Sequence, residues 1–312
     1  MKVLLTGATG FIGSHLLSAL GDNTVILSRK PVTNYLGPQF YCDLEKNDFE
    51  RDAFRNVDVV IHCAARPHIM NDSSSSPLEL YRVANTIATH SLAKVSAEMG
   101  VKRFIYISSI KVNGESTDCQ GAFKASDIPN PEDDYGISKS EAESHLMVLG
   151  KERGMEIVII RPPLVYGPGV KASFAALMNV ASKGVPLPFG LITNNRRSLV
   201  SITNLVDLVI RCVEHPNAAN QVFLVSDDHD FSTTKLVKSM YVATNKNSCL
   251  FPVPIWCFKL VGKLTGKSEV ISRLVGSLYV DISKTKELLD WTPPQSTEAA
   301  FKQVADTFNK SK

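Results

Sequence analysis

The chain has 312 residues, of which 44% are hydrophobic and 21% are charged, with a formal net charge of +3. This length is sufficient to bury a full core, with room for one large domain and a smaller one. Charges of both signs are interspersed and no basic block alternates with aromatic residues, so we expect no nucleic acid partner.

The first twenty residues combine an apolar strand, a glycine turn and a helix with leucines on one side. Gly7 permits a tight turn, Gly10 leaves room for a pyrophosphate beside the backbone, and Gly13 lets the helix pack close to the strand. The helix N-terminus that follows favours phosphate. We therefore predict a dinucleotide-binding turn, to which Phe11 and Ile12 also belong.

After this turn, apolar runs typical of buried parallel strands alternate with amphipathic segments typical of helices. Strands are expected near residues 24–27, 40–42, 57–65, 103–108 and 156–161, and helices over 77–99 and 135–153. This alternation predicts an α/β fold with a Rossmann-type, doubly wound parallel sheet.

Prolines and glycines become frequent after Arg161, which indicates that a looser region begins there. A strand at 199–202, a helix at 203–215 and a strand at 221–225 are expected to return to the first domain. Helices near 233–244, 254–264, 283–289 and 297–309 are expected in a smaller, mixed C-terminal lobe. We predict a dinucleotide-binding domain of residues 1–165 plus about 199–226, and a substrate lobe of residues 166–198 and 227–312. The ligand cleft would lie between them.

The cysteines and the apolar stretches indicate the compartment. Six cysteines, at positions 42, 63, 119, 212, 249 and 257, lack metal-ligand spacing, which favours a reducing cytosol and no metal site. The first strand begins without a signal peptide, and the apolar stretch 253–261 is too short to span a bilayer. We expect a cytoplasmic protein without a membrane partner.

Candidate catalytic residues begin with Tyr135 and Lys139, which are four apart and so share one helix face. A nearby cation lowers the pKa of a phenol, so this tyrosine is expected to exchange a proton near neutral pH. Ser108 and Ser109 follow the fifth expected strand, where a hydroxyl can hold a substrate oxygen.

Together these features resemble the extended short-chain dehydrogenase/reductases, also called the NAD-dependent epimerase/dehydratase family of nucleotide-sugar enzymes. The resemblance covers nearly the whole chain. It rests on Thr6-Gly7-x-x-Gly10-x-x-Gly13, Asp43-Leu44, the strand end at 62–65, Asn85, Ser108-Ser109, Tyr135-x-x-x-Lys139, Arg161-Pro162, Tyr166-Gly167-Pro168 and a C-terminal pattern over 283–293.

The resemblance implies a catalytic set of Ser109, Tyr135 and Lys139, in which the lysine also binds the nicotinamide ribose. It implies a homodimer formed by the 77–99 and 135–153 helices. Further cofactor contacts are implied for Asp43 and Leu44 beside the adenine, and for Ala64, Ala65, Asn85 and Pro162.

The end of the second strand departs from the pattern for NAD, which has an acidic residue there to hold the ribose 2′-hydroxyl. This chain has Ser28-Arg29-Lys30 instead. Two cations can bind a 2′-phosphate, so we expect NADPH to be favoured over NAD, with solvated charges as the alternative interpretation.

The part of the chain expected to bind the substrate also resembles the family. Phe189, in the loop from Pro186 to Gly190, is the residue expected to pack against a uracil. Arg197 and, less strongly, Arg273 match positions that hold a diphosphate, and guanidinium groups suit that role. Lys171 is a further candidate for the cleft. Val112-Asn113-Gly114 and Arg196-Arg197-Ser198 depart from the family pattern, so substrate contacts there are open.

Three functions remain at this point. The first is an oxidoreductase that reduces a UDP-4-keto-6-deoxy-N-acetylhexosamine to UDP-N-acetylquinovosamine, a branch associated with bacterial polysaccharide synthesis, with Tyr135 supplying the proton to O4. The alternative is a UDP-hexose 4-epimerase with retained NAD. The third is a cofactor-sensing regulator without activity.

Overall fold

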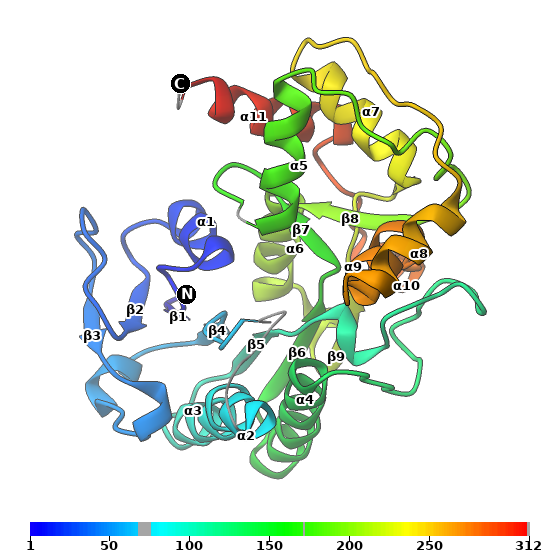
Figure 1. Ribbon diagram of the computed structural model, residues 1–312. Helices are drawn as coiled ribbons and strands as arrows, with labels where there is room; N and C mark the ends of the chain where they lie inside the picture. The colour runs from blue at the N-terminus through cyan, green and yellow to red at the C-terminus, as the bar shows by residue number, and fades with distance from the viewer. Residues whose placement is uncertain (68–75, 171, 311–312) are drawn as a thin grey trace.

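The larger part of the molecule is a seven-stranded parallel sheet in the order β3-β2-β1-β4-β5-β6-β9 (Figure 1). The computed structural model describes residues 1–67, 76–170 and 172–310. The strands are β1 (Val3–Thr6), β2 (Val25–Ser28), β3 (Gln39–Tyr41), β4 (Val59–His62), β5 (Arg103–Ile107), β6 (Glu156–Arg161) and β9 (Gln221–Leu224). The order reverses between β1 and β4, as in dinucleotide-binding sheets.

Helices cover both faces of this sheet. Consecutive strand residues face opposite sides, so Leu5 belongs to the core beneath α1 (Phe11–Leu20) and α6 (Ile202–Glu214), whereas Leu4 faces the other core. That second core is covered by α3 (Ala88–Glu98) and α4 (Asp134–Arg153). The helix α2 (Pro77–Tyr81) and the π-helical turn η3 (Arg82–Ile87) pack against α4. Burial on both faces explains why the strands are almost wholly apolar.

A smaller three-stranded sheet continues from the end of β6. Pro162 and Pro163 follow β6, and proline cannot donate to a strand ladder, so the chain leaves the large sheet there. The new strands, in the order β10-β8-β7, are β7 (Leu164–Tyr166), β8 (Arg197–Ser201) and β10 (Asp230–Phe231). Helices α5 (Ala172–Ser182), α7 (Thr233–Ala243) and α11 (Thr297–Lys310) complete a third core around stacked aromatic rings.

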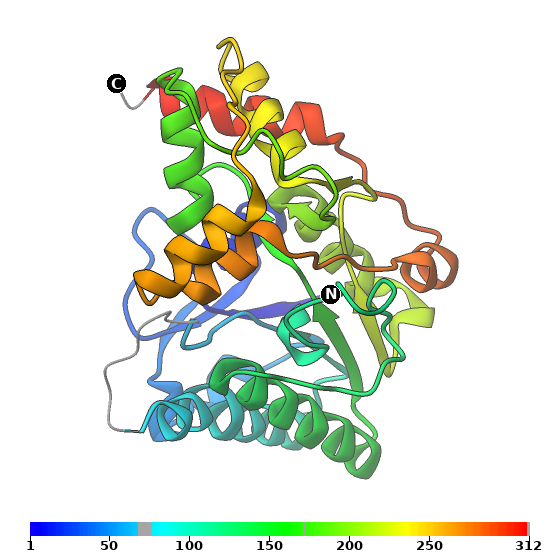
Figure 2. The ribbon, with the colours of Figure 1, turned by 45° about the vertical axis from the view of Figure 1, so that its right-hand side comes forward.

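Three further helices are short. They are α8 (Ile255–Leu264), α9 (Ser268–Val275) and α10 (Ser283–Leu289), and Figures 1 and 2 show α8 and α9 side by side. The 3₁₀ turns are η1 (Leu44–Lys46), η2 (Arg51–Phe54), η4 (Ile110–Val112) and η5 (Pro216–Ala218). Within the described residues, no helix is both long and apolar enough to cross a membrane.

The predicted fold class, a doubly wound parallel sheet with a smaller mixed lobe, is confirmed. The strand expected at 199–202 belongs to the small sheet, because β8 pairs with β7 and β10, while α6 and β9 lie with the large sheet. Helix α5 was not expected, since frequent prolines and glycines near residues 162–190 had indicated a loop, and α9 was not expected either. The division into two lobes at the stated boundaries stays a prediction.

Candidate active site

The glycine turn has the geometry that close approach of a phosphate needs. Gly7 has φ +73°, and a Cβ there would lie 2.6 Å from the Ala64 nitrogen. A Cβ on Gly13 would lie 2.1 Å from the Gly7 oxygen, so α1 can pack this closely only without a side chain. Gly10 is the N-cap residue of α1, and no side chain supplies a cap hydrogen bond there. These residues fit a bound dinucleotide, whose phosphates would meet the free N–H groups of the helix.

His62 is the last residue of β4 and holds the end of this strand beside the glycine turn. The sequence motif that contains His62 did not reveal this structural role. Its Nδ1 lies 2.6 Å from the Thr6 hydroxyl and its Nε2 lies 2.9 Å from the Thr89 hydroxyl. The Ala64 N–H also donates to the Thr6 hydroxyl, at 3.3 Å. Burial and the nearby Lys139 charge lower the pKa of His62 to about 3, so the ring is neutral. Ala64 and Ala65 are thereby held at the carboxyl edge of the sheet.

Asn85 has a structural role in the turn η3. Its Oδ1 accepts from the Arg66 N–H at 2.8 Å, and its Nδ2 donates to the Arg66 carbonyl and to the Ser138 hydroxyl. The side chain is fully buried, and these contacts use both amide donors. The expected direct contact of Asn85 with a cofactor is therefore not supported. Asn85 instead joins the segment after β4 to α4.

Lys139 is the most buried charged group near the candidate catalytic tyrosine. Only 2% of it is exposed, and its Nζ donates to the Ile107 carbonyl at 3.0 Å. The same Nζ lies 4.5 Å from the centre of the Tyr106 ring and 5.9 Å from that of Tyr135. The helix begins one residue before Tyr135, where the Asp133 carboxylate accepts from the Gly136 N–H. The Asp133 cap fixes the first turn of α4, which carries Tyr135, and the hydrogen bond to the Ile107 carbonyl fixes the Lys139 side chain.

The pKa values differ from the expectation for this pair. Burial lowers the pKa of Lys139 to about 8. Burial also raises the pKa of Tyr135, and the Asp133 carboxylate raises it further. Desolvation of the phenolate therefore dominates in the protein alone, and the expected lowering of the Tyr135 pKa by the nearby cation stays a prediction.

The two adjacent serines have different surroundings. Ser109 is partly exposed and caps η4, where its Oγ accepts from the Lys111 N–H at 3.3 Å. Ser108 is 3% exposed and donates to the Glu143 carboxylate, which pairs with Arg161 in the interior. The expected substrate contact of Ser108 is therefore not supported, because its hydroxyl belongs to a buried polar network. Pro162 lies beside η4, with its carbonyl accepting from the Ile110 N–H.

The ends of β2 and β3 lie side by side at the edge of the sheet. The Ser28 hydroxyl donates to the Lys30 carbonyl, which shapes the turn after β2. Arg29 and Lys30 are exposed. Asp43 caps η1, while the Leu44 side chain is half-buried. The candidate adenine and ribose residues are thus brought together at the carboxyl edge.

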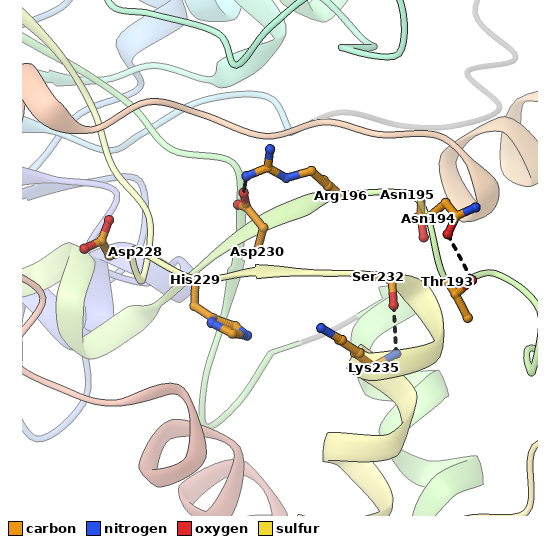
Figure 3. Close-up of a pocket in the computed structure, with 9 residues that line it drawn as sticks. All are labelled: Thr193, Asn194, Asn195, Arg196, Asp228, His229, Asp230, Ser232 and Lys235. Atoms are coloured by element: carbon orange, nitrogen blue, oxygen red, sulfur yellow. Dashed lines mark hydrogen bonds and ion pairs between the residues drawn. The ribbon is translucent and has the colours of Figure 1, made fainter.

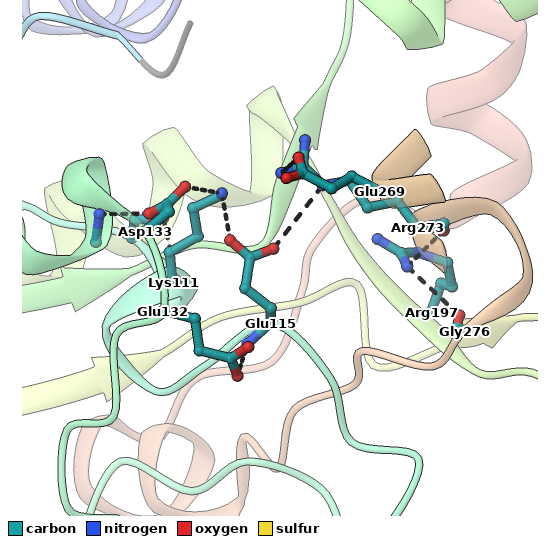
Figure 4. Close-up of polar contacts among 10 residues, drawn as sticks. Lys111, Glu115, Glu132, Asp133, Arg197, Glu269, Arg273 and Gly276 are labelled. Carbon is teal, nitrogen blue, oxygen red and sulfur yellow. Dashed lines mark hydrogen bonds and ion pairs between the residues drawn. The ribbon is translucent and has the colours of Figure 1, made fainter. Parts of the chain in front are cut away.

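Two of the candidate substrate residues, Arg197 and Arg273, are adjacent (Figure 4). Arg197 Nη1 donates to the Arg273 carbonyl at 2.8 Å and to the Gly276 carbonyl at 3.4 Å. Burial and the charge of Arg273 lower the pKa of Arg197, although the group stays cationic at neutral pH. Strand β8 and the end of α9 therefore hold the Arg197 guanidinium against the backbone of Arg273, with the two positive charges close enough to affect one another.

A charged chain that the sequence did not reveal links these arginines to the start of α4 (Figure 4). Arg273 Nε lies 3.8 Å from the Glu115 carboxylate, which pairs with Lys111 at 2.5 Å. Lys111 also pairs with Asp133, the residue that caps α4. The loop after Ser109 thus connects the candidate proton donor with the candidate diphosphate site.

Phe189 is partly buried in the small lobe. Its ring centre lies 6.0 Å from that of Phe258 on α8, and its carbonyl accepts from the Thr234 hydroxyl. This contact leaves the ring packed between the loop and α8 rather than in solvent. Lys171, the remaining substrate candidate, lies outside the described residues.

A separate polar cavity of about 350 Å³ contains none of the predicted site residues (Figure 3). It is lined by Thr193, Asn194, Asn195, Arg196, Asp228, His229, Asp230, Ser232 and Lys235. Arg196 pairs with Asp230, and the Ser232 hydroxyl caps α7 by accepting from the Lys235 N–H. These polar groups stabilise the local structure, so the cavity does not identify a functional site.

The sheet order, the glycine turn and the Tyr135–Lys139 pair define a dinucleotide-binding enzyme of the short-chain dehydrogenase/reductase type. Residues 3–226 match the NAD dependent epimerase/dehydratase family, and the chain belongs to this family. A UDP-glucose 4-epimerase of Vibrio cholerae is 53% identical to it over 312 residues, which cover 98% of this chain and 95% of that protein.

Other relatives are more distant. The N-acetyl-alpha-D-glucosaminyl-diphospho-ditrans,octacis-undecaprenol 4-epimerase of Escherichia coli O157:H7 is 27% identical over 87% of this chain and 83% of that one. The solved UDP-glucuronic acid 4-epimerase from Bacillus cereus in complex with NAD has a TM-score of 0.79 at 23% identity, covering 100% of this chain and 99% of that chain. This likeness supports the fold alone.

Two finer expectations are not supported. The 53% identity to a UDP-glucose 4-epimerase favours the epimerase alternative over the reductase. The expected preference for NADP also lacks support, since the family name specifies NAD. Physically, Arg29 and Lys30 are exposed charges after a strand, which is compatible with simple solvation.

Proposed function

We propose that the protein is a UDP-hexose 4-epimerase that retains NAD. The observation that carries this proposal is 53% identity to a UDP-glucose 4-epimerase along nearly the whole of both chains, and the buried Lys139 ammonium beside the Tyr135 ring supports it. A reductase remains the second candidate, because exposed Arg29 and Lys30 occur where NAD sites have a carboxylate. The regulator is disfavoured, since binding a cofactor alone needs no proton donor.

The candidate cofactor residues fit NAD. Gly7, Gly10 and Gly13 leave space for the pyrophosphate, with Phe11 and Ile12 supplying backbone N–H groups at the helix N-terminus. Asp43 and Leu44 would border the adenine, and Ala64, Ala65 and Pro162 the rest of the dinucleotide. When bound, NAD supplies reversible removal and return of hydride at the sugar C4.

Tyr135 would exchange the proton at the sugar O4, and Ser109 would hold that oxygen by a hydrogen bond. The buried Lys139 ammonium gives this site a positive charge, which favours the phenolate once the proton leaves. The raised pKa of Tyr135 keeps the phenol protonated in the free protein, so the phenol must lose this proton before it can accept the one on O4. The phenol formed in that step is then the acid that returns the proton to O4. Proton transfer to and from one oxygen is what inversion at C4 requires.

The nucleotide half of the substrate would lie in the small lobe. Arg197 and Arg273 would bind the diphosphate by charge-assisted hydrogen bonds, and Phe189 would pack against the uracil. Glu115 holds Arg273 on the side of the catalytic residues. Binding of this kind would fix the hexose between the two lobes, next to Tyr135.

A homodimer through η3, α3 and α4 belongs to the same proposal. These helices cover one face of the large sheet, and Ile87 and Val148 on them are at least half exposed. A shared four-helix interface would bury these apolar side chains. The two-lobe division, with residues 1–165 on the cofactor side, is also part of it.

The test is product analysis with paired substrates. Purified protein is incubated with UDP-glucose, UDP-galactose or their N-acetylated counterparts, and the nucleotide sugars are separated by chromatography. The proposal predicts that each member of at least one pair converges to the same equilibrium ratio without net redox change. Absence of interconversion, with NADPH consumed only when a UDP-4-keto-6-deoxy sugar is present, would instead establish the reductase.

A further inference from the structure

Helix α8 exposes a row of large apolar side chains. Trp256, Leu260 and Leu264 follow one another at intervals of four residues, so they lie on one side of the helix. Trp256 is 65% exposed and Leu264 is 76% exposed. Val261, next to this row, is also exposed. Large apolar groups clustered in this way are unusual on a water-facing helix and indicate a contact surface.

The opposite side of α8 is packed, so the exposed row has a fixed direction. Gly262 is buried against α9, where a Cβ would lie 2.7 Å from Ile271 Cγ1. Phe258 contacts Phe189. Figures 1 and 2 show α8 and α9 at the outside of the small lobe. The apolar row therefore points away from the rest of the protein.

Positive charge accompanies the row. Lys259 and Lys263 on α8 and Lys267 just after it are exposed, and α8 contains no acidic residue. Lysine side chains bury their methylene groups along apolar surface while keeping the ammonium in water. A short helix with tryptophan and leucine on one side and flanking lysines has the chemistry of helices that lie in the interface of an anionic membrane.

We propose that the α8 face, defined as Trp256, Lys259, Leu260, Lys263, Leu264 and Lys267, docks on an anionic lipid surface. The ten-residue helix is about 15 Å long, which suits insertion parallel to the surface and not across it. The expectation of no membrane partner rested on the lack of a membrane-spanning segment. Docking of the α8 face on the lipid surface needs no such segment and replaces that expectation.

This proposal is independent of the proposed reaction, and its test does not use activity as the main readout. The protein is mixed with vesicles of phosphatidylcholine alone, or of phosphatidylcholine with about 30 mol % phosphatidylglycerol, and floated through a density gradient. The α8 face predicts flotation with the anionic vesicles only, reduced by about 0.5 M salt.

Tryptophan fluorescence gives a second readout. The chain has two tryptophans, and Trp291 is 4% exposed, so a blue shift on vesicle addition reports on Trp256. The double variant Leu260→Asp with Leu264→Asp should weaken vesicle binding at least about tenfold and abolish the shift. The variant Lys263→Glu with Lys267→Glu should weaken binding while keeping the folded far-UV spectrum.

Leu36→Asp is the matched control, because Leu36 is 90% exposed on a loop of the large lobe. It should bind vesicles as the wild type does. Absence of flotation with anionic vesicles, or equal flotation of the wild type and both α8 variants, would overturn the proposal. A Trp256 shift that rises with protein concentration in the absence of lipid would also overturn it, in favour of a second copy of the chain on this face.

Discussion

The Glu143 carboxylate and the Arg161 guanidinium form an ion pair in the interior, with Nη2 2.5 Å from Oε2 and Nε 3.0 Å from Oε1. Ser108 and Asn113 satisfy the remaining polar atoms of this pair. The network joins β5, α4 and β6 directly behind Ser109. It therefore fixes the backbone that presents the candidate catalytic serine.

Removing one partner should strongly destabilise the protein. Glu143→Ala leaves the Arg161 charge buried without a counterion, so we expect a loss of about 3 to 5 kcal/mol in the free energy of unfolding. Urea denaturation measures it. The matched control is Glu141→Ala on the same helix, whose partner Arg82 is much more exposed, and its loss should be far smaller. Equal losses for the two variants would contradict the structural role of the pair.

Tyr135→Phe should abolish turnover while leaving the fold and dinucleotide affinity almost unchanged, because only the phenol hydroxyl is lost. General acid or base catalysis is typically worth ~100-fold or more in rate, so kcat should fall by at least that factor. Steady-state kinetics, with calorimetry for dinucleotide binding, provide the measurement. A variant that keeps more than about a tenth of the wild-type kcat would rule out Tyr135 as the proton donor.

The buried Lys139 predicts a pH dependence of stability. Its pKa is lowered from 10.5 to about 8 in the folded protein, so between these values the unfolded chain binds more protons than the folded one. Stability contributed by this group is therefore complete above pH 10.5 and is lost as the pH falls to 8.

Lys139→Met removes this titration. The difference in unfolding free energy, wild type minus Lys139→Met, should rise with pH across that interval when both are denatured in urea without added nucleotide. The same variant should bind dinucleotide more weakly. A difference independent of pH would show that the folded lysine keeps an ordinary pKa.

Ile87→Glu with Val148→Glu tests the proposed dimer. Both positions are exposed in the single chain, so charges there cost little in the monomer but are unfavourable inside an apolar interface. Light scattering coupled to size exclusion should report a dimer for the wild type and a monomer for the variant. A wild-type monomer, or a variant that stays dimeric, would contradict the interface.

Local patterns were the strongest source of prediction. The glycine turn and the Tyr135 to Lys139 spacing depend on neighbours within one turn and one helix, and the structure has both in the expected elements. The doubly wound parallel sheet followed from the alternation of apolar and amphipathic segments. Such signals need no knowledge of distant contacts.

Features built from distant segments were not predictable in the same way. Ser108 looked equivalent to Ser109, and only the approach of Glu143 from α4 distinguishes them. Glu115 gave no signal of its contact with Arg273, which lies 158 residues further along the chain. The exposure of α8 likewise depends on α9 covering only one of its sides.

The central claim is that the protein is an epimerase with a retained cofactor, and the most direct measurement is its nucleotide content. Protein purified without added dinucleotide is denatured, and the released nucleotide is identified by mass and quantified, while a second sample is assayed without added cofactor. The account predicts close to one NAD per chain and interconversion of a UDP-hexose pair by that sample. Protein that contains no dinucleotide, and turns over a UDP-4-keto-6-deoxy sugar only when NADPH is supplied, would contradict it.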